Sequence, residues 1–354
     1  MSRPWLLYGA SGYTGELIAR RAVATGERPV LAGRGAERVS RLAAELGLER
    51  RVFALEDPVE VDRGLAGMGA VLHCAGPFSR TASPMAQGCL RGRVHYLDIT
   101  GEIDVFEGMA ARDPEAQRAG ITLLPGVGFD VVPSDCLAAH LHRRLPSATH
   151  LALGFQGSAR LSRGTATTMV ENLHRGGAVR RAGRIVPVPA AWKTRVIDFG
   201  AGPAAAITIP WGDVATAFHT TGIPNVEVYM AAPPAMRFLL KLARPVAPLL
   251  AARPVQSFLK GRIRSGPPGP GAEHRARARS RLWGEARDAT QAVVSRLETL
   301  EGYELTSRTA LLALQRVLAG GAPAGFQTPA RAFGPDFILE VEGTSRTDEP
   351  PRPV

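Results

Sequence analysis

Cysteine, lysine and aromatic residues are scarce in this sequence of 354 residues. The three cysteines, Cys74, Cys89 and Cys136, are odd in number and form no Cys-x-x-Cys pair, which argues against a disulfide framework and against a zinc site. Cysteine usage of this kind favours a reducing compartment, so we expect a cytoplasmic protein without a metal site. No opening segment combines a basic start with an uninterrupted apolar run, so we expect no secretory signal.

A long charge-free apolar run is also missing. Residues 236–257 are apolar but are interrupted by arginine, lysine and proline, whereas a helix that spans a bilayer needs about 20 nearly charge-free residues. This stretch is therefore not expected to cross a membrane. Because basic and apolar residues mix over residues 236–264, peripheral contact with a membrane surface stays open.

The formal net charge is +11, yet only three of the 43 basic residues are lysine. The excess of arginine accompanies abundant alanine, glycine and proline, which indicates a general arginine bias rather than a basic face. Binding of single-stranded nucleic acid favours aromatic residues interleaved with the basic ones, and few aromatic residues are interleaved with the arginines here. We therefore expect no nucleic-acid partner.

The most informative stretch is residues 4–15, in which a short apolar strand runs into three glycines and a helical pattern follows. Gly9 permits a tight turn, Gly12 lets the backbone approach a phosphate, and Gly15 lets the helix pack closely on the strand. This order predicts a pyrophosphate bound at a helix N-terminus.

The end of the next strand, residues 30–34, selects the cofactor in such a fold. An acidic residue there would bind the ribose hydroxyls of NAD, but this chain has Gly33 and Arg34, with Arg38 one helical turn later. A guanidinium pairs with a 2′-phosphate through charge-assisted hydrogen bonds, so NADP(H) is the predicted cofactor. The alternative is that Arg34 is one more surface arginine.

Strands and helices alternate with short loops over the first 125 residues, which predicts an α/β fold with a Rossmann doubly wound parallel sheet. The pattern then changes to one expected of a second, mixed α/β (α+β) domain. We place an NADP-binding domain at residues 1–130, a substrate or lid domain at 131–300 and a C-terminal segment at 301–345. Residues 346–354 are expected to be a disordered tail, and residues 275–282 to be a strand.

The proton-donating Tyr-x-x-x-Lys pair of short-chain reductases is absent. Carboxylates at strand ends remain as candidate catalytic residues: Asp98, Glu102 and Asp130. Asp98 has the alternative role of bracing its loop, and Glu102 that of a first-turn charge on the next helix. Asp213 and His219 are further candidates from the second domain.

Several motifs together resemble the saccharopine dehydrogenase-like family, which includes saccharopine reductases and mycobacterial trans-acting enoyl reductases. The matching stretches are Gly9–Gly15, Leu31–Arg34, Ala75–Phe78, Tyr96–Glu102, Gly128–Asp135 and, more loosely, Ser162–Thr167. The resemblance implies that the first domain binds NADP(H), that a mixed domain covers the nicotinamide, and that a helix near residues 311–318 packs back on the first domain.

Carried over residue by residue, the resemblance implies a set of cofactor-binding positions. They are Gly9, Ser11, Gly12, Tyr13, Thr14, Gly15, Gly33, Arg34, Cys74, Ala75, Gly76, Pro77 and Thr100. Cys74 has the alternative role of a small buried residue.

The function expected from these features is that of an NADP(H)-dependent oxidoreductase reducing a C=C or C=N bond of a small or lipid-like substrate. The apolar runs at residues 238–240 and 249–250 hint at a lipid, although ordinary core packing explains them equally well. Imine reduction needs cations for substrate carboxylates, which Arg160, Arg163 and Arg175 could supply. A non-catalytic NADP(H)-binding sensor or scaffold is the alternative, and a homodimer stays open.

Overall fold

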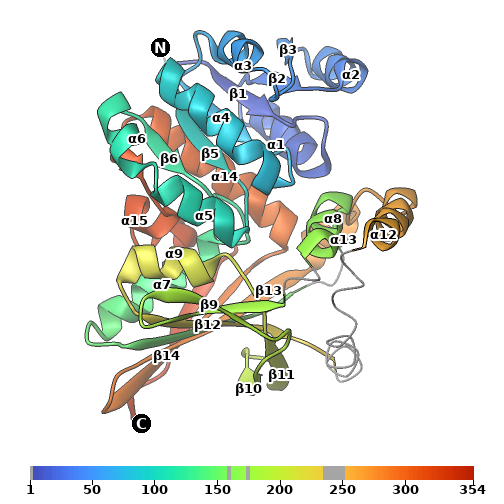
Figure 1. Ribbon diagram of the computed structural model, residues 1–354. Coiled ribbons are helices and arrows are strands. Elements are labelled where there is room, and N and C mark those ends of the chain that lie inside the picture. Colours follow the sequence, from blue (N-terminus) through green and yellow to red (C-terminus); the bar gives the residue numbers. More distant parts are fainter. Residues whose placement is uncertain (1–2, 158–160, 173–175, 234–251) are drawn as a thin grey trace. The chain divides into compact units, whose positions relative to one another are not determined.

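The computed structural model describes residues 3–157, 161–172, 176–233 and 252–354, which form two compact units (Figure 1). The first unit comprises Met1–Val132 and Tyr303–Phe333, and the second comprises Pro133–Gly302 and Gly334–Val354. The chain therefore leaves the first unit once, returns to it, and ends in the second.

The first unit is built on a seven-stranded sheet in the order β15-β6-β5-β4-β1-β2-β3, and all of its pairings are parallel. This confirms the predicted Rossmann sheet, whose strand order reverses direction between β1 and β4. The strands are β1 (Trp5–Tyr8), β2 (Val30–Gly33), β3 (Arg50–Val52), β4 (Ala70–His73), β5 (His95–Asp98), β6 (Thr122–Leu124) and β15 (Gly325–Phe326).

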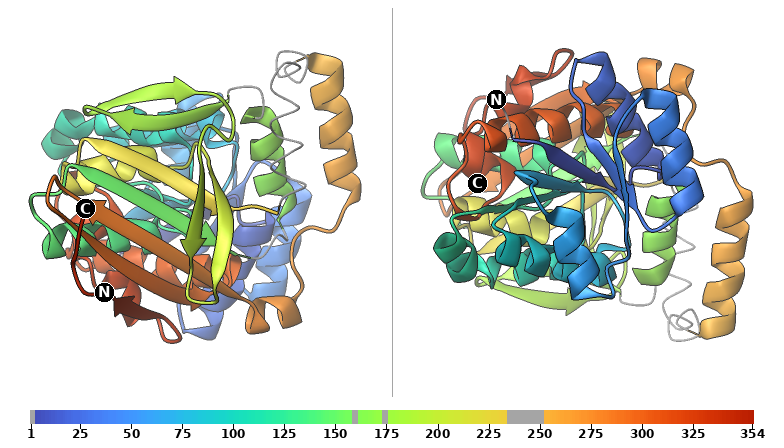
Figure 2. Two further views of the ribbon diagram at one scale, coloured as in Figure 1. Left: turned by 90° about the horizontal axis from the view of Figure 1, so that it is seen from below. Right: turned by 90° about the horizontal axis from the view of Figure 1, so that it is seen from above.

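Helices cover the sheet, so that β1, β2 and β4 are buried along their whole length. Helix α4 packs against α3, α5 and α6, and α14 lies along α1 (Figure 2). The helices are α1 (Tyr13–Ala24), α2 (Ala36–Leu46), α3 (Pro58–Leu65), α4 (Phe78–Gly92), α5 (Ile103–Ala110), α6 (Asp113–Ala119), α14 (Gly302–Leu318) and α15 (Pro329–Phe333).

Local sequence signals explain several of these boundaries. The Asp57 side chain accepts a hydrogen bond from the Val59 amide at the start of α3, where Pro58 occupies the first turn. Gly47 ends α2 in the left-handed region, with φ of 63°.

The C-terminal part of the chain divides between the two units. Residues 303–333 complete the first unit, where β15 pairs with β6 and the Phe326 amide donates to Asp113. Residues 334–354 lie in the second unit, so the predicted segment 301–345 is not one body.

The predicted disordered tail is wrong. Residues Ser345–Asp348 form β16 and Arg352–Pro353 form β17, and both pair with β14. Asp348 accepts a hydrogen bond from Ser295 Oγ at 2.6 Å. The tail is polar because it lies at a sheet edge, and composition alone does not distinguish an edge strand from a disordered end.

The second unit has a ten-stranded sheet in the order β10-β11-β12-β7-β13-β14-β16, joined by β8, β9 and β17. Only β7 and β12 pair in parallel among its described pairings, so the predicted mixed domain is confirmed. The remaining strands are β7 (His150–Gln156), β8 (Gly177–Arg181), β9 (Arg184–Val188), β10 (Thr194–Asp198), β11 (Pro203–Thr208), β12 (Asn225–Ala231), β13 (Arg279–Arg287) and β14 (Gln291–Leu300).

Helix α7 packs closely on this sheet, since a Cβ on Gly284 would lie 2.5 Å from Leu141. On the other face the β10–β11 pair crosses the strands (Figure 2, left), and Arg195 lies 4.5 Å from the ring of Trp283. The helices are α7 (Val132–Arg144), α8 (Arg163–Asn172), α9 (Asp213–Thr221), α12 (Arg253–Ser265), α13 (Ala272–Arg277) and a 3-10 turn, η3 (Phe337–Glu340).

The strand predicted over residues 275–282 is only partly correct. Helix α13 extends to Arg277, and β13 begins at Arg279. Alternating arginine and alanine imitate the period of a strand, but both residues are strong helix formers. Within the described residues, no helix combines the length and apolar character needed to cross a membrane.

His73 is an unusual member of the first unit's core. Its side chain is fully buried, and neither ring nitrogen has a hydrogen-bond partner among the described residues. The rings of Tyr8 and Phe78 lie 5.4 Å away and that of Tyr96 lies 6.3 Å away. Burial lowers the pKa of His73 to about 3, because the charged imidazolium would lose its hydration.

Replacing His73 with Phe should reduce the acid sensitivity of the fold. The folded-state pKa of about 3 lies below the ordinary 6.5, so the unfolded chain binds a proton that the folded chain does not as the pH falls below 6.5. Between pH 6.5 and about 3, the unfolding free energy of the wild type therefore falls by about 1.4 kcal/mol for each unit by which the pH is lowered. Urea unfolding at pH 5 and pH 8 measures how much the unfolding free energy changes with pH, with pH 8, where His73 is neutral in both states, as the internal control. An equal change in the wild type and in His73→Phe would contradict this account.

Candidate active site

The turn after β1 has the geometry that its glycines predict. Gly9 has φ of 82°, and its amide donates to the carbonyl of Ala32 on the neighbouring β2 at 2.8 Å. A Cβ on Gly9 would lie 2.7 Å from the Ala75 amide nitrogen. Positive φ and the close approach of β4 therefore both require glycine here.

The N-terminus of α1 lies directly on this turn. A Cβ on Gly15 would come within 2.3 Å of the Gly9 carbonyl oxygen, so any side chain would push the helix away. The N-cap residue, Gly12, offers no side chain to accept from the first-turn amides of Tyr13 and Thr14. With Ser11 beside it, this helix start fits a pyrophosphate as the acceptor.

Two arginines follow the end of β2. Gly33 ends the strand, and a Cβ there would lie 3.3 Å from Val39, so a larger residue would crowd the helix behind it. Arg34 and Arg38 are exposed, and neither guanidinium group forms a hydrogen bond or ion pair with any residue that the structure describes. Two uncommitted cations at this position fit a third phosphate group.

The loop after β4 begins at the point where the strand order reverses. The Cys74 amide donates to the Tyr8 carbonyl at 2.7 Å, and the Ala75 carbonyl accepts from Thr81 Oγ1 at 2.7 Å. Gly76 and Pro77 then lead directly into α4, with Pro77 at its N-cap position. Burial raises the pKa of the Cys74 thiol well above its ordinary value, so the thiol stays protonated and is not a reactive thiolate.

Glu102 connects this loop to the next one. One of its carboxylate oxygens accepts from the Phe78 amide at 2.8 Å and the other from the Ser79 amide at 3.0 Å. The side chain therefore caps α4, although Glu102 precedes α5 in the sequence. Its own amide donates to Thr100 Oγ1 at 3.1 Å, which fixes the turn between them.

Asp98, at the end of β5, is buried and accepts three hydrogen bonds. The donors are the Tyr96 hydroxyl at 2.6 Å and the amides of Thr100 and Gly126 at 2.9 Å each. The Asp98 carbonyl also accepts from the Val127 amide at 2.8 Å. Burial raises the pKa of Asp98 to about 6 in spite of these donors. The side chain braces the loops after β5 and β6.

Asp130 lies in the loop after β6 and packs against the loop after β5. A Cβ on Gly101 would lie 2.9 Å from Asp130 Oδ2, so glycine leaves the room that this carboxyl group occupies. Burial raises the pKa of Asp130 to about 7. A carboxylic acid with a pKa close to neutral can both release and recover a proton at physiological pH.

Helix α14 contributes contacts to this region that the sequence did not reveal. The Phe129 amide donates to Thr306 Oγ1 at 2.9 Å, and Thr309 Oγ1 donates to the Val127 carbonyl at 2.8 Å. More than 170 residues separate the partners along the chain. The helix itself could be recognised from its apolar spacing, but a threonine on it carries no signal of its partner.

The catalytic candidates predicted from the second domain, Asp213 and His219, lie in the second unit. Asp213 and His219 both lie on α9, and Asp213 is buried in its first turn. Ser162 Oγ accepts from the Thr165 amide at 3.2 Å at the start of α8. The predicted cations Arg160 and Arg175, and residues 234–251, lie outside the described residues.

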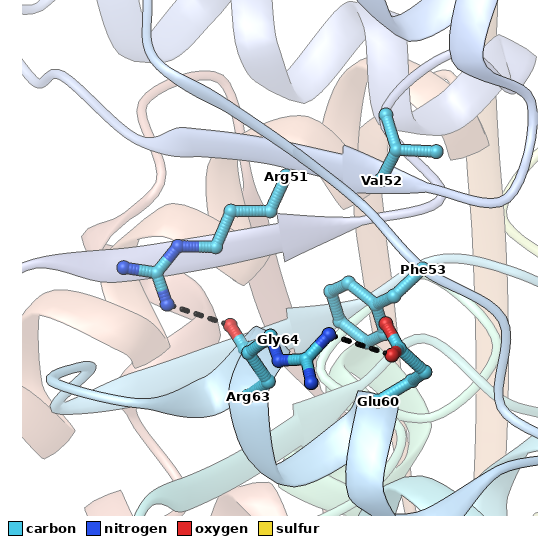
Figure 3. A pocket seen from close by; sticks show the side chains of 6 residues that line it. All are labelled: Arg51, Val52, Phe53, Glu60, Arg63 and Gly64. Carbon is cyan, nitrogen blue, oxygen red and sulfur yellow. Dashed lines mark hydrogen bonds and ion pairs between the residues drawn. The ribbon is translucent and has the colours of Figure 1, made fainter.

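A separate hollow of about 300 Å³ lies between β3 and α3 (Figure 3). Arg51 donates there to the carbonyls of Gly64 and Ala66 at 2.8 Å each, and Arg63 pairs with Glu60. Both cations already have acceptors, so we assign no phosphate site to this hollow. In the part of the chain that the structure describes, no group of three or more His, Cys, Asp and Glu side chains could hold a metal ion.

Residues 5–124 match the family model of the saccharopine dehydrogenase NADP binding domain. Residues 5–124 are an NADP-binding domain of the saccharopine dehydrogenase type. This confirms both the family resemblance and the NADP(H) cofactor predicted from the glycine turn and Arg34. The match covers β1 to β6, the strands whose carboxyl ends carry the loops described above.

Curated relatives extend the similarity beyond the NADP-binding domain. The trans-acting enoyl reductase of Mycobacterium tuberculosis (strain ATCC 25618 / H37Rv) is 29% identical over 219 residues, covering 56% of this chain and 50% of the relative. The saccharopine dehydrogenase-like oxidoreductase of Mus musculus is 27% identical over 152 residues, covering 37% of this chain and 35% of the relative. The chain thus spans about half the length, or less, of the curated relatives it matches.

Among solved structures, apo saccharopine dehydrogenase (L-Glu forming) from Saccharomyces cerevisiae has a similar fold. The TM-score is 0.65 at 12% identity, and the match covers 98% of this chain and 100% of the other. At 12% identity, this likeness is evidence for the fold alone. The likeness therefore supports the fold of the chain, a parallel Rossmann sheet and a second mixed sheet, and nothing more.

Removing the Glu102 carboxylate should destabilise the start of α4. Glu102→Ala leaves the Phe78 and Ser79 amides without an acceptor, a loss comparable to that of a helix cap, about 1–2 kcal/mol. Thermal unfolding measures this loss, and Glu115→Ala on the exposed surface of α6 is the matched control. Equal melting temperatures for the two variants would contradict the capping role.

Proposed function

We propose that this protein is an NADPH-dependent oxidoreductase that reduces a C=C bond of a small-molecule substrate. One set of features carries the proposal: a helix start suited to a pyrophosphate, two uncommitted arginines, and a half-buried carboxyl group with a pKa near 7. All three follow directly after strands of one parallel sheet, at the carboxyl ends where ligands bind in this fold. The bound cofactor would supply the hydride.

The cofactor-binding residues in this proposal follow the geometry of the loops. The amides after Gly9 hold the pyrophosphate, and Arg34 and Arg38 hold the 2′-phosphate. The remaining residues that would line the cofactor are Ser11, Gly12, Tyr13, Thr14, Gly15, Gly33, Cys74, Ala75, Gly76, Pro77 and Thr100. The loops that carry Cys74 to Pro77 and Thr100 follow β4 and β5, next to the point where the strand order reverses.

Among the three candidate carboxylates, Asp130 is the one we assign as the proton donor. Asp98 is surrounded by three donors and Glu102 by two, so their oxygens are committed to holding loops. Asp130 lies in the loop after β6, and burial raises its pKa to about 7, above that of Asp98. Asp98 and Glu102 then act as positioning residues.

Reduction of a C=C bond is favoured over that of a C=N bond. The relatives named trans-acting enoyl reductase match 56% of this chain at 29% identity. The sequence match to saccharopine dehydrogenase covers only the NADP-binding residues 5–124, and beyond them that likeness is one of fold at 12% identity. Of the arginines suggested for an imine substrate's carboxylates, Arg163 donates to the Gly266 carbonyl, and the others lie outside the described residues.

The predictions of a lipid-like substrate, of contact with a membrane surface and of a homodimer stay predictions. The described part of residues 236–264 is α12 with its flanking residue, on which Phe258 is exposed and Lys260 pairs with Glu171. A lipid-like substrate, contact with a membrane surface and a homodimer are each compatible with these residues. The non-catalytic sensor differs from the proposed enzyme in one observable, since it would bind NADPH without ever oxidising it.

Reversing the charge of Arg34 should remove the preference for NADPH. Arg34→Glu is expected to weaken NADPH binding about ten- to a hundredfold, the loss of one or two charge-assisted hydrogen bonds, while NADH binding changes little. Titration of cofactor fluorescence gives both dissociation constants. Arg63→Glu, on the exposed surface of α3, is the matched charge control. An unchanged NADPH preference in Arg34→Glu would show that another residue reads the 2′-phosphate.

Removing the proton of Asp130 should abolish turnover but not cofactor binding. Asp130→Asn is expected to lower kcat by about 10²- to 10⁴-fold, the usual contribution of general acid catalysis, with the dissociation constant of NADPH unchanged. NADPH oxidation against a panel of enoyl, imine and carbonyl compounds measures the effect, with Glu115→Gln as control. Full activity of Asp130→Asn would sink the assignment, and no oxidation by the wild type on any compound favours the sensor.

A further inference from the structure

The loop from Gly126 to Asp130 is held from two sides. On one side, Asp98 accepts from the amides of Gly126 and Val127. On the other side, Thr306 Oγ1 accepts from the Phe129 amide at 2.9 Å. The Phe129 amide directly precedes Asp130, so this bond fixes the backbone next to the candidate acid.

The contact with α14 is close because the loop carries a glycine at its centre. A Cβ on Gly128 would lie 2.9 Å from Cγ2 and 3.1 Å from Oγ1 of Thr306. Thr309, one helical turn later, donates to the Val127 carbonyl at 2.8 Å. Two threonines on one helix face therefore hold an amide and a carbonyl of the same loop, and they are buried.

The same helix also contacts α1 at both of its ends. The ring of Tyr303 meets that of Tyr13 edge-on, with centroids 5.1 Å apart. Arg21 Nε donates to Ser307 Oγ at 2.8 Å and Arg21 pairs with Glu304. Helix α14 thus sets the loop before Asp130 relative to the helix whose start receives the pyrophosphate.

We propose that Thr306 is a positioning residue for Asp130: through its bond to the Phe129 amide it holds the candidate proton donor at a fixed place beside Gly101. The proposal rests on the proposed function for its catalytic meaning. The placement itself rests on contacts within the first unit. A threonine from the end of the chain would then share in a reaction whose other groups lie within its first 130 residues.

The test compares two variants of Thr306 with a matched control. Thr306→Val keeps the shape of the side chain and removes the acceptor, whereas Thr306→Ser keeps the oxygen. Thr122→Val is the control, because it removes a different buried hydrogen bond of the first unit, from Thr122 Oγ1 to the Pro323 carbonyl. If Thr306→Val does not fold, Thr309→Val loosens the same loop and is read in the same way.

The first measurement needs no substrate. Infrared spectroscopy of the carboxyl band, assigned to Asp130 by its loss in Asp130→Asn, follows the titration of that group in the full chain. In Thr306→Val the pKa of Asp130 is expected to fall from about 7 toward its ordinary value, because a loosened loop admits water. Thr306→Ser and Thr122→Val should titrate like the wild type.

The second measurement is NADPH oxidation with the substrate that the wild type accepts best. Thr306→Val should lower kcat about tenfold or more and move the alkaline limb of the pH profile, on which Asp130 loses its proton, to lower pH, with the NADPH dissociation constant unchanged. Wild-type titration of Asp130 in Thr306→Val would overturn the proposal. If the titration shifts but the wild type oxidises NADPH with no compound, the positioning stands and the proposed function fails.

Discussion

The Asp98 carboxylate accepts from a side chain on β5 and from the loops after β5 and β6, and the geometry of the candidate site depends on it. Removing a carboxylate from water is costly unless donors replace the hydration. Here the Tyr96 hydroxyl and the amides of Thr100 and Gly126 replace it. Thr100, whose amide donates to Asp98, also accepts from the amide of Glu102, the residue that caps α4. Gly126, the other amide donor, begins the loop that carries Asp130. A single buried anion thereby sets the spacing of three loops.

Much of the first unit could be predicted because its signals are local. The glycine turn is contiguous, and each glycine answers to a contact within one strand–turn–helix unit or with the adjacent strand, as Gly15 does with the Gly9 carbonyl. The positions of Arg34 and Cys74 follow from strand order alone. Parallel strands place their carboxyl ends at one edge, so strand ends read from the sequence predict which residues meet there.

The remaining features depend on pairs that are distant in the chain. The sequence offers Glu102 as a catalytic candidate or as a first-turn charge on the helix that follows it, but its carboxylate caps α4, the helix before β5. Thr306 meets Phe129 across 177 positions. The strand Ser345–Asp348 pairs with β14, although its polar composition imitates a disordered end. A side chain's type limits what it can bond to, but only the tertiary fold supplies the partner.

Strand β15 lies beside β6, although the whole span from Pro133 to Gly302 is synthesised between them. A ribosome therefore releases six strands of the first sheet long before the seventh. Throughout that interval the outer edge of β6 has no neighbouring strand, and the loop before Asp130 lacks the helix that holds it. The nascent chain must complete most of its second unit before its first can close. The part made earliest is thus among the last to reach its final form.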